Sequence, residues 1–373
     1  MAVSNVLVVG GGITGSVLAV ALARRGVEVT LVELAPEWRG VGHGITIQGN
    51  ALKAFRSVGI WDRLAAEGVG FDRLRMRKAD GSLLVEVPTP RTGGDDLPAT
   101  LGSLRSVLQG ILRDAVYAAG VTVRLGLTVA ELDPDSGSVT FTDGSTGHYD
   151  VVVGADGIRS HVRSLLGMAI DPQPVGMGIW RVVADRPAEM DCAEVYYGGP
   201  RYKAGYSPIS ATKCYAYLLD EPLDESLIGP HAPVELLRER SAGYGGTWGR
   251  LRDALPDDQV VDYRWIEYVS LAAPWFRGRA VIIGDAAHAC PPLIAQGAAM
   301  CAEDAVVLAE ELTGPAPVPD ALAAFMARRL PRVRTVLDAS MRLVDWEIHP
   351  DTPGADPARV MSEALSFLAG ADA

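Results

Sequence analysis

Apolar runs and glycines alternate over the first forty residues. Residues 5–9 (NVLVV) are a short apolar, β-branched run, which is typical of a strand buried on both faces of a parallel sheet. A stretch of helical period follows and ends at Gly26, and residues 27–32 (VEVTLV) form a second strand that leads into Glu33. The pattern therefore predicts a βαβ unit of about thirty residues.

Two further blocks carry a similar pattern. The block that begins at Arg105 predicts one helix and four strands, with hairpin-type turns at 135–137 and 143–144. The last block opens with an apolar strand at 280–283 and is then almost wholly helical. The helix of the middle block is predicted over 105–119, and its strands over 121–125, 127–133, 138–142 and 149–154.

The region between these blocks is rich in aromatic residues. Nine of the eleven tyrosines and four of the seven tryptophans lie within residues 173–275. This bias fits the β-propensity of aromatic residues and equally fits a ligand pocket, and the sequence leaves both readings open. Residues 73–78 and 83–87, joined at Asp80-Gly81, predict another hairpin.

We therefore expect an α/β protein with two domains that interleave along the chain. A length of 373 residues corresponds to about two domains. The nucleotide-binding domain is predicted over 1–72, 99–172 and 276–373, and a β-rich domain over 73–98 and 173–275.

Charge and cysteine content exclude several classes of function. The chain has 34 Lys and Arg against 46 Asp and Glu, a net charge of −12, which argues against nucleic acid or an anionic membrane as the main partner. The apolar stretch at 6–23 contains four glycines, so it is better explained as strand, turn and helix than as a membrane span. Four cysteines without metal-ligand spacing predict no metal site and no disulfide framework, which favours the cytoplasm.

The first motif with chemical content is Gly10-x-Gly12-x-x-Gly15, followed by Glu33. The first glycine permits a tight turn, the second lets a pyrophosphate approach the backbone, and the third lets helix and strand pack closely. The following helix would present its positive end to the phosphates, and Glu33 would accept hydrogen bonds from a ribose diol. The motif predicts a dinucleotide site but does not distinguish NAD from FAD.

Two later motifs make that distinction. One is the strand and turn at 150–160 (DVVVGADGIRS), and the other is residues 280–292 (AVIIGDAAHACPP) followed by Gln296-Gly297. With the first motif, in this order and over nearly the whole chain, they resemble the flavin-dependent aromatic hydroxylases, the single-component monooxygenases of the para-hydroxybenzoate and salicylate hydroxylase type. This resemblance implies a Rossmann-like FAD-binding domain with an inserted β-sheet-rich substrate domain and C-terminal helices.

The resemblance also implies roles for individual residues. Arg105 matches an arginine that reaches the FAD ribose and pyrophosphate, Asp156 matches a motif linked to both FAD and the pyridine nucleotide, and Asp285 matches the aspartate that bonds the ribityl chain. His288 is expected to be structural more often than catalytic. The full set expected to bind FAD is Gly10, Gly12, Ile13, Thr14, Gly15, Glu33, Arg39, Gln48, Arg105, Val129, Asp156, Gly157, Gly284, Asp285, Pro291, Gly297 and Ala298.

The chain departs from the family pattern at two places. Ala295 stands where the family usually has glycine. Alanine is well tolerated at this position if the backbone φ there is negative. Gly49 replaces a common proline in the glycine-rich stretch at 39–50. We still expect FAD to bind, with the helix that begins near Gly297 directing its positive end at the flavin.

The family resemblance implies a reaction. NADH or NADPH, bound transiently without a Rossmann domain of its own, would reduce the flavin, and dioxygen would give a flavin hydroperoxide that hydroxylates a small aromatic or heteroaromatic ring. The residues expected to act as base or to position the substrate are His43, Tyr206, Tyr215 and Tyr217. A hydrogen bond of His43 to backbone or phosphate is the other reading of that residue. Since phenols titrate near ~10, tyrosines serve better as hydrogen-bond partners than as bases. A monomer or a homodimer is expected.

Two alternatives remain open at this point. The same scaffold can serve a flavin reductase or dehydrogenase that inserts no oxygen. A prenyl-protein escort of the guanine-nucleotide dissociation inhibitor type shares the fold without flavin chemistry, although the aspartates at 156 and 285 argue against it. The sequence does not identify the substrate.

Overall fold

The computed structural model describes residues 3–38, 42–224, 228 and 232–370. Its nucleotide-binding part is built on a six-stranded sheet with the strand order β18-β19-β12-β1-β2-β8. Five of these strands run parallel, and only the short β18 is antiparallel to its neighbour. The strands are β1 (Asn5–Val9), β2 (Glu28–Glu33), β8 (Thr122–Leu125), β12 (Val151–Gly154), β18 (Phe276–Arg277) and β19 (Ala280–Ile282).

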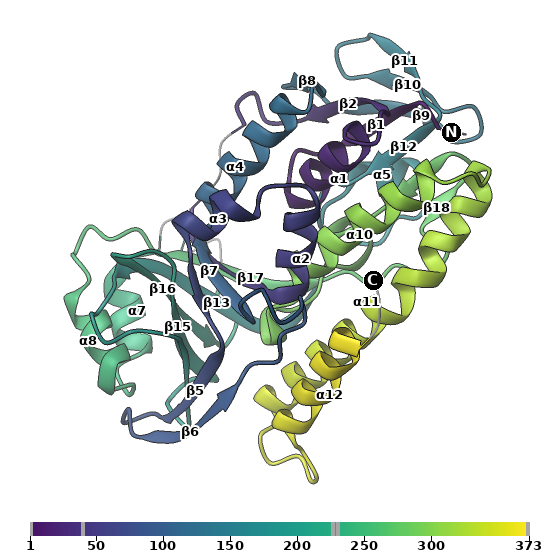
Figure 1. Ribbon diagram of the computed structural model, residues 1–373. Helices are drawn as coiled ribbons and strands as arrows, with labels where there is room; N and C mark the ends of the chain where they lie inside the picture. Colours follow the sequence, from purple (N-terminus) through teal and green to yellow (C-terminus); the bar gives the residue numbers. More distant parts are fainter. Residues whose placement is uncertain (1–2, 39–41, 225–227, 229–231, 371–373) are drawn as a thin grey trace.

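Helices cover this sheet and explain why its strands are apolar on both faces. Helix α1 (Ile13–Ala23) is buried from Thr14 to Leu22, because the sheet lies on one side and α10 (Gly297–Thr313) packs on the other. Helix α4 (Arg105–Ala118) packs beside α1, and the long α11 (Val318–Ile348) packs along α10 (Figure 1). The expected βαβ unit is therefore present.

A seven-stranded sheet lies apart from the parallel sheet, at the lower left of Figure 1. Its order is β17-β13-β16-β15-β14-β5-β6, so the strands of the 73–88 hairpin join those of the 173–268 region. The assignment of these segments to a separate domain agrees with this pairing and stays a prediction. The strands are β5 (Arg73–Lys78), β6 (Leu83–Pro88), β13 (Gln173–Asp185), β14 (Ala193–Tyr197), β15 (Lys203–Pro208), β16 (Lys213–Asp220) and β17 (Asp262–Tyr268).

Two faces of this seven-stranded sheet have different neighbours. We call the face that carries Tyr215 the inner face, because Tyr215 lies against Gly44 of a small sheet that joins the two parts of the molecule. The opposite, outer face is covered by α7 (Val234–Arg240) and α8 (Gly246–Ala254) and contains a second apolar core around Trp180. The small joining sheet consists of β3 (Gly44–Gln48), β7 (Thr100–Leu104) and β4 (Val69–Phe71).

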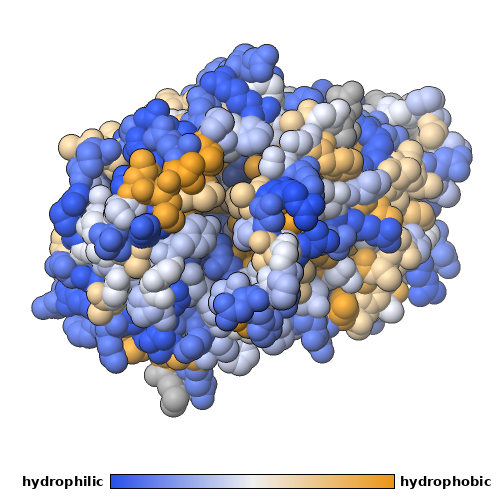
Figure 2. All heavy atoms as spheres, turned by 90° about the horizontal axis from the view of Figure 1, so that it is seen from below, coloured by the Kyte–Doolittle hydropathy of each residue, from blue (hydrophilic) through white to orange (hydrophobic). Residues whose placement is uncertain are grey.

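The remaining elements complete the surface. A separate antiparallel sheet contains β9 (Val129–Asp133), β10 (Ser138–Phe141) and β11 (Thr146–His148). Strand β6 is an edge strand with exposed Leu83, Leu84 and Val85, and the view from below shows apolar side chains in separate patches on a mostly hydrophilic face (Figure 2). The other helices are α2 (Gly49–Ser57), α3 (Trp61–Glu67), α5 (His161–Leu165), α9 (Asp285–His288), the 3-10 turn at Pro292–Ile294 and α12 (Pro357–Gly370).

Candidate active site

The three sequence motifs come together at one edge of the parallel sheet. Strands β1, β12 and β19 are adjacent, with Val9 in register with Gly154 and Gly154 in register with Ile282. A side chain at Gly10 would touch the backbone of Ala155 and Asp156, and one at Gly284 would touch Thr14. Ligands bind at the carboxyl ends of the strands in open α/β sheets, so this edge is the expected place for a nucleotide.

The first glycine turn is shaped by close backbone contacts. Gly10 has a φ of 107°, and a Cβ there would lie 2.4 Å from the Ala155 carbonyl oxygen. A Cβ at Gly15 would lie 1.9 Å from the carbonyl oxygen of Gly10, so only glycine lets α1 approach the turn. Within the described chain, a Cβ at Gly12 would have no atom within 4 Å, which leaves open space in front of the helix N-terminus.

This space suits a pyrophosphate. Gly12 is the N-cap of α1, and no described side chain caps the helix, so the backbone N–H groups of its first turn are available to an anion. The predicted residues Ile13 and Thr14 form that first turn. The glycine cradle and the uncapped helix end therefore fit the phosphates of FAD.

Glu33 lies at the end of β2 with both carboxylate oxygens engaged by the backbone. One oxygen accepts a hydrogen bond from the N–H of Gly11 at 2.7 Å and the other from Ala35 at 2.8 Å. These bonds fix the carboxylate beside the glycine turn. Because a carboxylate has about four acceptor positions, it can still accept from a ribose diol.

The turn after β12 is held by Asp156. Its carboxylate accepts hydrogen bonds from the Ser160 hydroxyl and from the backbone N–H groups of His161 and Val162. Asp156 therefore fixes the N-terminus of α5, and its predicted contact with FAD and pyridine nucleotide stays a prediction. Gly157 follows with a φ of 80°, a conformation that favours glycine.

The third motif places Asp285 at the start of a short helix. Gly284 has a φ of 63°, and a Cβ there would lie 2.4 Å from Thr14 Oγ1. Cys301 Sγ lies 3.5 Å from one carboxylate oxygen of Asp285, and the other oxygen has no hydrogen-bond partner among the described residues. Asp285 can therefore offer this oxygen to a hydroxyl of the cofactor.

A buried ionic network lies beneath this loop. Asp304 accepts a hydrogen bond from the Gly284 N–H at 2.9 Å and lies 2.6 Å from His288 Nε2. Arg329, which is fully buried, donates to Asp304 at 2.7 Å and to Glu303 at 2.5 Å. Asn50 donates to both Glu303 and Gln296. The network joins α2, α10 and α11 and fixes both loops that would hold the flavin; His288 belongs to it.

The turn before α10 departs from expectation at Ala295. Its φ is +52° and its ψ is 33°, so the alanine occupies the left-handed conformation that glycine favours. The favourable case considered from the sequence, a negative φ, is thus not the one found. The predicted residues Pro291, Gly297 and Ala298 flank this turn, and no described side chain caps the N-terminus of α10.

Replacing Ala295 by glycine is expected to stabilise the protein. The left-handed conformation costs a non-glycine residue roughly 1–2 kcal/mol, and glycine removes this cost. Part of the stability gained is lost again, because glycine has more conformational freedom in the unfolded chain. We expect Ala295→Gly to raise the free energy of unfolding by about 0.5–1 kcal/mol in chemical denaturation. Ala66→Gly, at an exposed position of α3, should lower it. An equal loss in both variants would contradict the prediction.

The other predicted cofactor residues that the structure describes lie on β3, α4 and β9. Gln48 is buried at the end of β3, and Arg105 is exposed at the first turn of α4. Val129 is fully buried at the start of β9. Arg39 lies outside the described residues. Two residues that the motifs did not indicate contact the glycine turn: Trp38 and Gln109 both donate to the Gly11 carbonyl, at 2.9 and 2.6 Å.

Three polar residues gather where β3 meets the inner face. His43 precedes β3, and its Nε2 atom lies 3.3 Å from Asp262 of β17 and 3.4 Å from Arg181 of β13. Burial lowers the pKa of His43 to about 4, and the positive charge of Arg181 acts in the same direction while Asp262 opposes it. His43 is therefore neutral at pH 7, with a lone pair on one ring nitrogen, although the lowered pKa makes it a weaker base than a free imidazole.

Two of the three candidate tyrosines face this group. Tyr215 pairs with Ser207 and Tyr217 with Gly205, so both side chains lie on the inner face, with ring centroids 5.8 Å apart. Burial raises the pKa of both hydroxyls. They consequently stay protonated at neutral pH and can act as apolar walls and hydrogen-bond donors.

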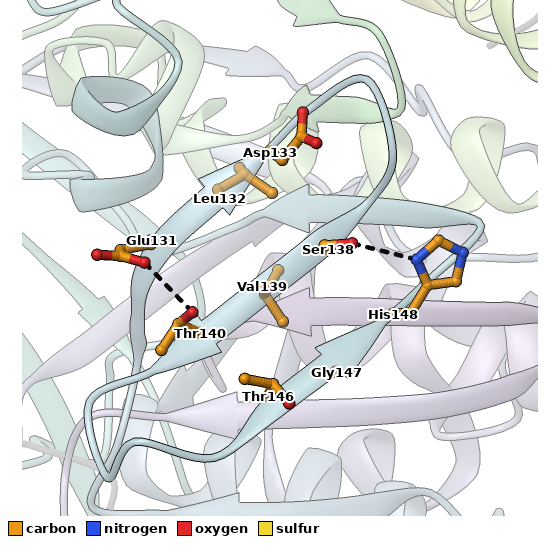
Figure 3. A pocket seen from close by; sticks show the side chains of 9 residues that line it. All are labelled: Glu131, Leu132, Asp133, Ser138, Val139, Thr140, Thr146, Gly147 and His148. Atoms are coloured by element: carbon orange, nitrogen blue, oxygen red, sulfur yellow. Dashed lines mark hydrogen bonds between the residues drawn. The ribbon is translucent and has the colours of Figure 1, made fainter.

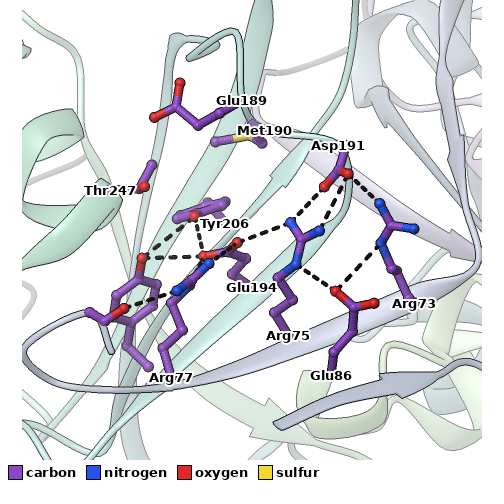
Figure 4. Close-up of polar contacts among 12 residues, drawn as sticks. Arg73, Arg75, Arg77, Glu86, Glu189, Met190, Asp191, Glu194, Tyr206 and Thr247 are labelled. Atoms are coloured by element: carbon purple, nitrogen blue, oxygen red, sulfur yellow. Dashed lines mark hydrogen bonds and ion pairs between the residues drawn. The ribbon is translucent and has the colours of Figure 1, made fainter. Parts of the chain in front are cut away.

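Tyr206 lies elsewhere. It alternates with Gly205 and Ser207 along β15, so its side chain points to the outer face, where its hydroxyl donates to the buried Glu194. Figure 4 shows it beside the array formed by Arg73, Arg75 and Arg77 with acidic partners. The structure does not bring Tyr206 to the other candidates, because a period-two strand sends neighbouring side chains to opposite faces.

A second polar pair lies farther along the inner face. Lys203 of β15 donates to Glu347, near the end of α11, at 2.5 Å, and lies 5.8 Å from the ring centroid of Tyr197. This pair connects the end of α11 with the seven-stranded sheet. Neither residue had a local sequence pattern that marked it, as with Arg181 and Asp262, because strands and helices distant in sequence bring them together.

A surface hollow on the β9-β10-β11 sheet is distinct from this site. Its lining comes entirely from the three strands and contains none of the predicted site residues (Figure 3). Among the described residues, no cluster of His, Cys, Asp or Glu is arranged to hold a metal ion. Within the described chain, no helix has the length and apolar character needed to cross a membrane.

The fold and the glycine cradle define a dinucleotide-binding protein of the doubly wound α/β class. A family model described as FAD binding domain matches residues 3–208 and 254–340, more than half of the chain. The chain belongs to the FAD-dependent aromatic hydroxylase family. The expected family, fold and cofactor FAD are thereby confirmed.

Individual relatives cover nearly the whole chain. The 2-heptyl-3-hydroxy-4(1H)-quinolone synthase of Pseudomonas aeruginosa (strain UCBPP-PA14) is 34% identical over 355 residues, which cover 92% of this chain and 90% of the relative. The 6-hydroxynicotinate 3-monooxygenase of Bordetella bronchiseptica is 30% identical over 351 residues, 89% and 90% of the two chains. The crystal structure of Klebsiella pneumoniae HpxO complexed with FAD and uric acid has the same fold, with a TM-score of 0.82 at 24% identity and coverage of 98% and 92%.

Proposed function

We propose that this member of the family uses NADH or NADPH and dioxygen to hydroxylate a small heteroaromatic ring. The observation that carries the proposal is the convergence of the three motifs at one sheet edge. Strand β3, which contacts both α10 and β16, links this edge to the inner face with Tyr215, Tyr217 and the His43 group. One relative is named for the synthesis of a hydroxyquinolone and another as a monooxygenase of 6-hydroxynicotinate, and both names support a nitrogen heterocycle with an oxygen substituent. The four cysteines of the chain are free thiols, which supports a location in the reducing cytoplasm.

The chain's own residues divide the work between binding and chemistry. Bound FAD would supply the activation of dioxygen with electrons from the nicotinamide. The glycine turn and α1 would bind its pyrophosphate, Glu33 the adenosine ribose and Asp285 the ribityl chain. The uncapped N-terminus of α10 would stabilise negative charge on the ring system.

The inner face would hold the substrate. Tyr215 and Tyr217 offer two aromatic surfaces for a flat ring, and their protonated hydroxyls can donate hydrogen bonds. The neutral imidazole of His43 would accept the proton of a ring hydroxyl, which raises the electron density of the ring. Packing of β3 against this face would exclude water from the reacting atoms.

The reaction class can be tested with labelled oxygen. Purified, FAD-loaded protein is offered hydroxylated pyridines, quinolones and aromatic acids, and NADH and NADPH oxidation is followed with and without each compound. We expect at least one compound to stimulate oxidation and to yield a product heavier by one oxygen atom that comes from ¹⁸O₂. Substrate turnover without label in the product would favour a reductase or dehydrogenase and overturn the proposal.

Asp285 gives a second test of the same assignment. We expect Asp285→Ala to lose most of its bound FAD, because the substitution removes the carboxylate that would bond the ribityl chain. FAD content is measured by absorbance after gel filtration, at matched folded fraction by circular dichroism. Asp338→Ala, at an exposed position of α11, is the control and should retain FAD. Full FAD content in Asp285→Ala would contradict the role of the third motif.

A further inference from the structure

The group around His43 contains an acid that the sequence did not indicate. Asp262 is directly opposite Arg181 in the pairing of β13 and β17, and the two side chains lie 3.6 Å apart on the inner face. His43 Nε2 is 3.3 Å from Asp262 Oδ2 and 3.4 Å from Arg181 Nη1. One imidazole nitrogen therefore lies between an acceptor and a donor.

These two neighbours demand different tautomers. If Nε2 carries the proton, it donates to Asp262 and the lone pair is on Nδ1. If Arg181 donates to Nε2, the ring proton must be on Nδ1, which then cannot act as a base. Nδ1 has no hydrogen-bond partner among the described residues, so it is the nitrogen left for a ligand.

We propose that Asp262 is a positioning residue that holds His43 in the tautomer protonated at Nε2 and so prepares Nδ1 to accept the proton of a substrate ring hydroxyl. The proposal rests on the proposed function of the same site. In this step the substrate O–H bond breaks, its electron pair stays on the ring oxygen, and an N–H bond forms at Nδ1. Asp262 then faces the resulting imidazolium, and the proton later passes to solvent.

Asp262 is well placed for this task. Its Oδ2 atom is buried and accepts no well-aligned hydrogen bond from the described residues, although His43 is close, so a rotation of the imidazole would complete the contact. Such bonds are often long before a substrate binds. Its other oxygen accepts from Arg264 at 3.2 Å, which fixes the carboxylate on β17.

The charges that surround His43 make an acidic partner necessary. Arg181 of β13, Arg264 of β17 and Arg105 of α4 all disfavour a positive imidazole, and Asp262 is the neighbour that favours it. Tyr215 of β16, whose pKa is raised by burial, adds no charge at neutral pH. Without Asp262, three arginines would face a residue that must become a cation during proton transfer.

The test is Asp262→Asn, because an amide keeps the shape and can donate to Nε2 and favour the wrong tautomer. In a serine protease the corresponding change lowers kcat by about 10⁴ with intact geometry, and proton transfer by a side chain contributes about 10²–10⁴. We expect kcat for hydroxylation to fall by about 10²-fold or more at pH 7. The loss should shrink at a pH at which the substrate hydroxyl is already ionised in solution.

A spectroscopic measurement separates positioning from mere support of the fold. In ¹⁵N-histidine-labelled, FAD-loaded protein, His43 should show the Nε2–H tautomer in the wild type and the Nδ1–H tautomer in Asp262→Asn. The control is Asp185→Asn at the end of β13, the strand that carries Arg181; its exposed carboxylate pairs with Lys213 at the surface. This control should leave kcat and the His43 tautomer unchanged.

The outcomes are distinct from those of the proposed function. An unchanged tautomer in Asp262→Asn, or a loss of kcat that is the same at every pH, would overturn the positioning role. If the wild-type protein incorporates no oxygen from dioxygen, the proposed function fails. The tautomer comparison would still decide whether Asp262 controls His43.

Discussion

Arg329→Met is expected to lower the free energy of unfolding by about 3–5 kcal/mol at neutral pH, the cost of leaving a buried charge without its partner. Arg329 is fully buried and donates to Glu303 and Asp304, which are buried themselves. Methionine fills much of the same volume, so the loss would come chiefly from two buried carboxylates that lose the cation they share. Arg332, which also bonds Glu303, compensates only in part.

The loss of stability in Arg329→Met should depend on pH. In the wild type, His288 and Arg329 overcome the effect of burial and hold the pKa of Asp304 at about 2, below its usual range. Asp304 thus contributes stability above pH ~4, and this contribution is lost as pH falls towards 2. In Arg329→Met the two buried carboxylates lose this cation, so we expect protonation at low pH to relieve the cost of their burial. The difference between the two proteins should therefore narrow as the pH is lowered.

Urea denaturation at several pH values measures both effects. The matched control is the adjacent Arg328→Met, whose guanidinium pairs with Glu310 and Glu311 at the protein surface. Exposed pairs contribute about 0–1 kcal/mol, so this variant should unfold nearly as the wild type does. A similar small loss in both variants would show that the buried network does not carry the stability assigned to it.

The sequence predicts the nucleotide site far better than the substrate site. Gly10, Gly12, Gly15 and Glu33 lie in one short βαβ unit, and the geometry of such a unit follows from local periodicity and backbone freedom. The two later motifs are also contiguous, and parallel pairing of the buried strands they follow brings all three together.

The residues of the proposed substrate site are brought together by long-range pairing. His43, Arg181 and Asp262 come from segments more than 80 residues apart. The register of β13 with β17 sets Arg181 opposite Asp262, and the packing of β3 against β16 brings His43 to them. Strand register also decides which tyrosines face inward: Tyr215 and Tyr217 do, whereas Tyr206 lies on the other face. Composition could show the aromatic bias of this region but not the face on which each ring lies.

Local backbone conformation is the other feature that could not be predicted from the sequence. The sequence marks Ala295 as a departure from glycine, yet the sign of φ depends on how the turn joins Pro292 to α10. The joining sheet β3-β7-β4 was likewise not predicted, because its strands are short and lie far apart along the chain. These elements connect the cofactor and substrate parts of the site.

A pair of glycine substitutions can separate the folding role of the first motif from its binding role. In Gly15→Ala the new methyl group would lie 1.9 Å from the Gly10 carbonyl oxygen, a backbone atom that cannot turn away, so α1 must move from the turn. Overpacking of a tight core costs about 1–3 kcal/mol or more. We expect Gly15→Ala to lose this stability and FAD together.

Gly12→Ala is the matched variant with the opposite balance. Gly12 has a φ of −70°, which alanine adopts freely, and its Cβ would meet no atom of the described chain within 4 Å. The apo protein should therefore unfold at nearly the wild-type urea concentration. The methyl group would project into the space assigned to the pyrophosphate, so FAD affinity, measured by titration of the apo protein, should fall by at least tenfold, about 1.4 kcal/mol. If Gly12→Ala binds FAD with wild-type affinity, the pyrophosphate does not bind at this turn, because the only expected effect of the added methyl group is to block that space.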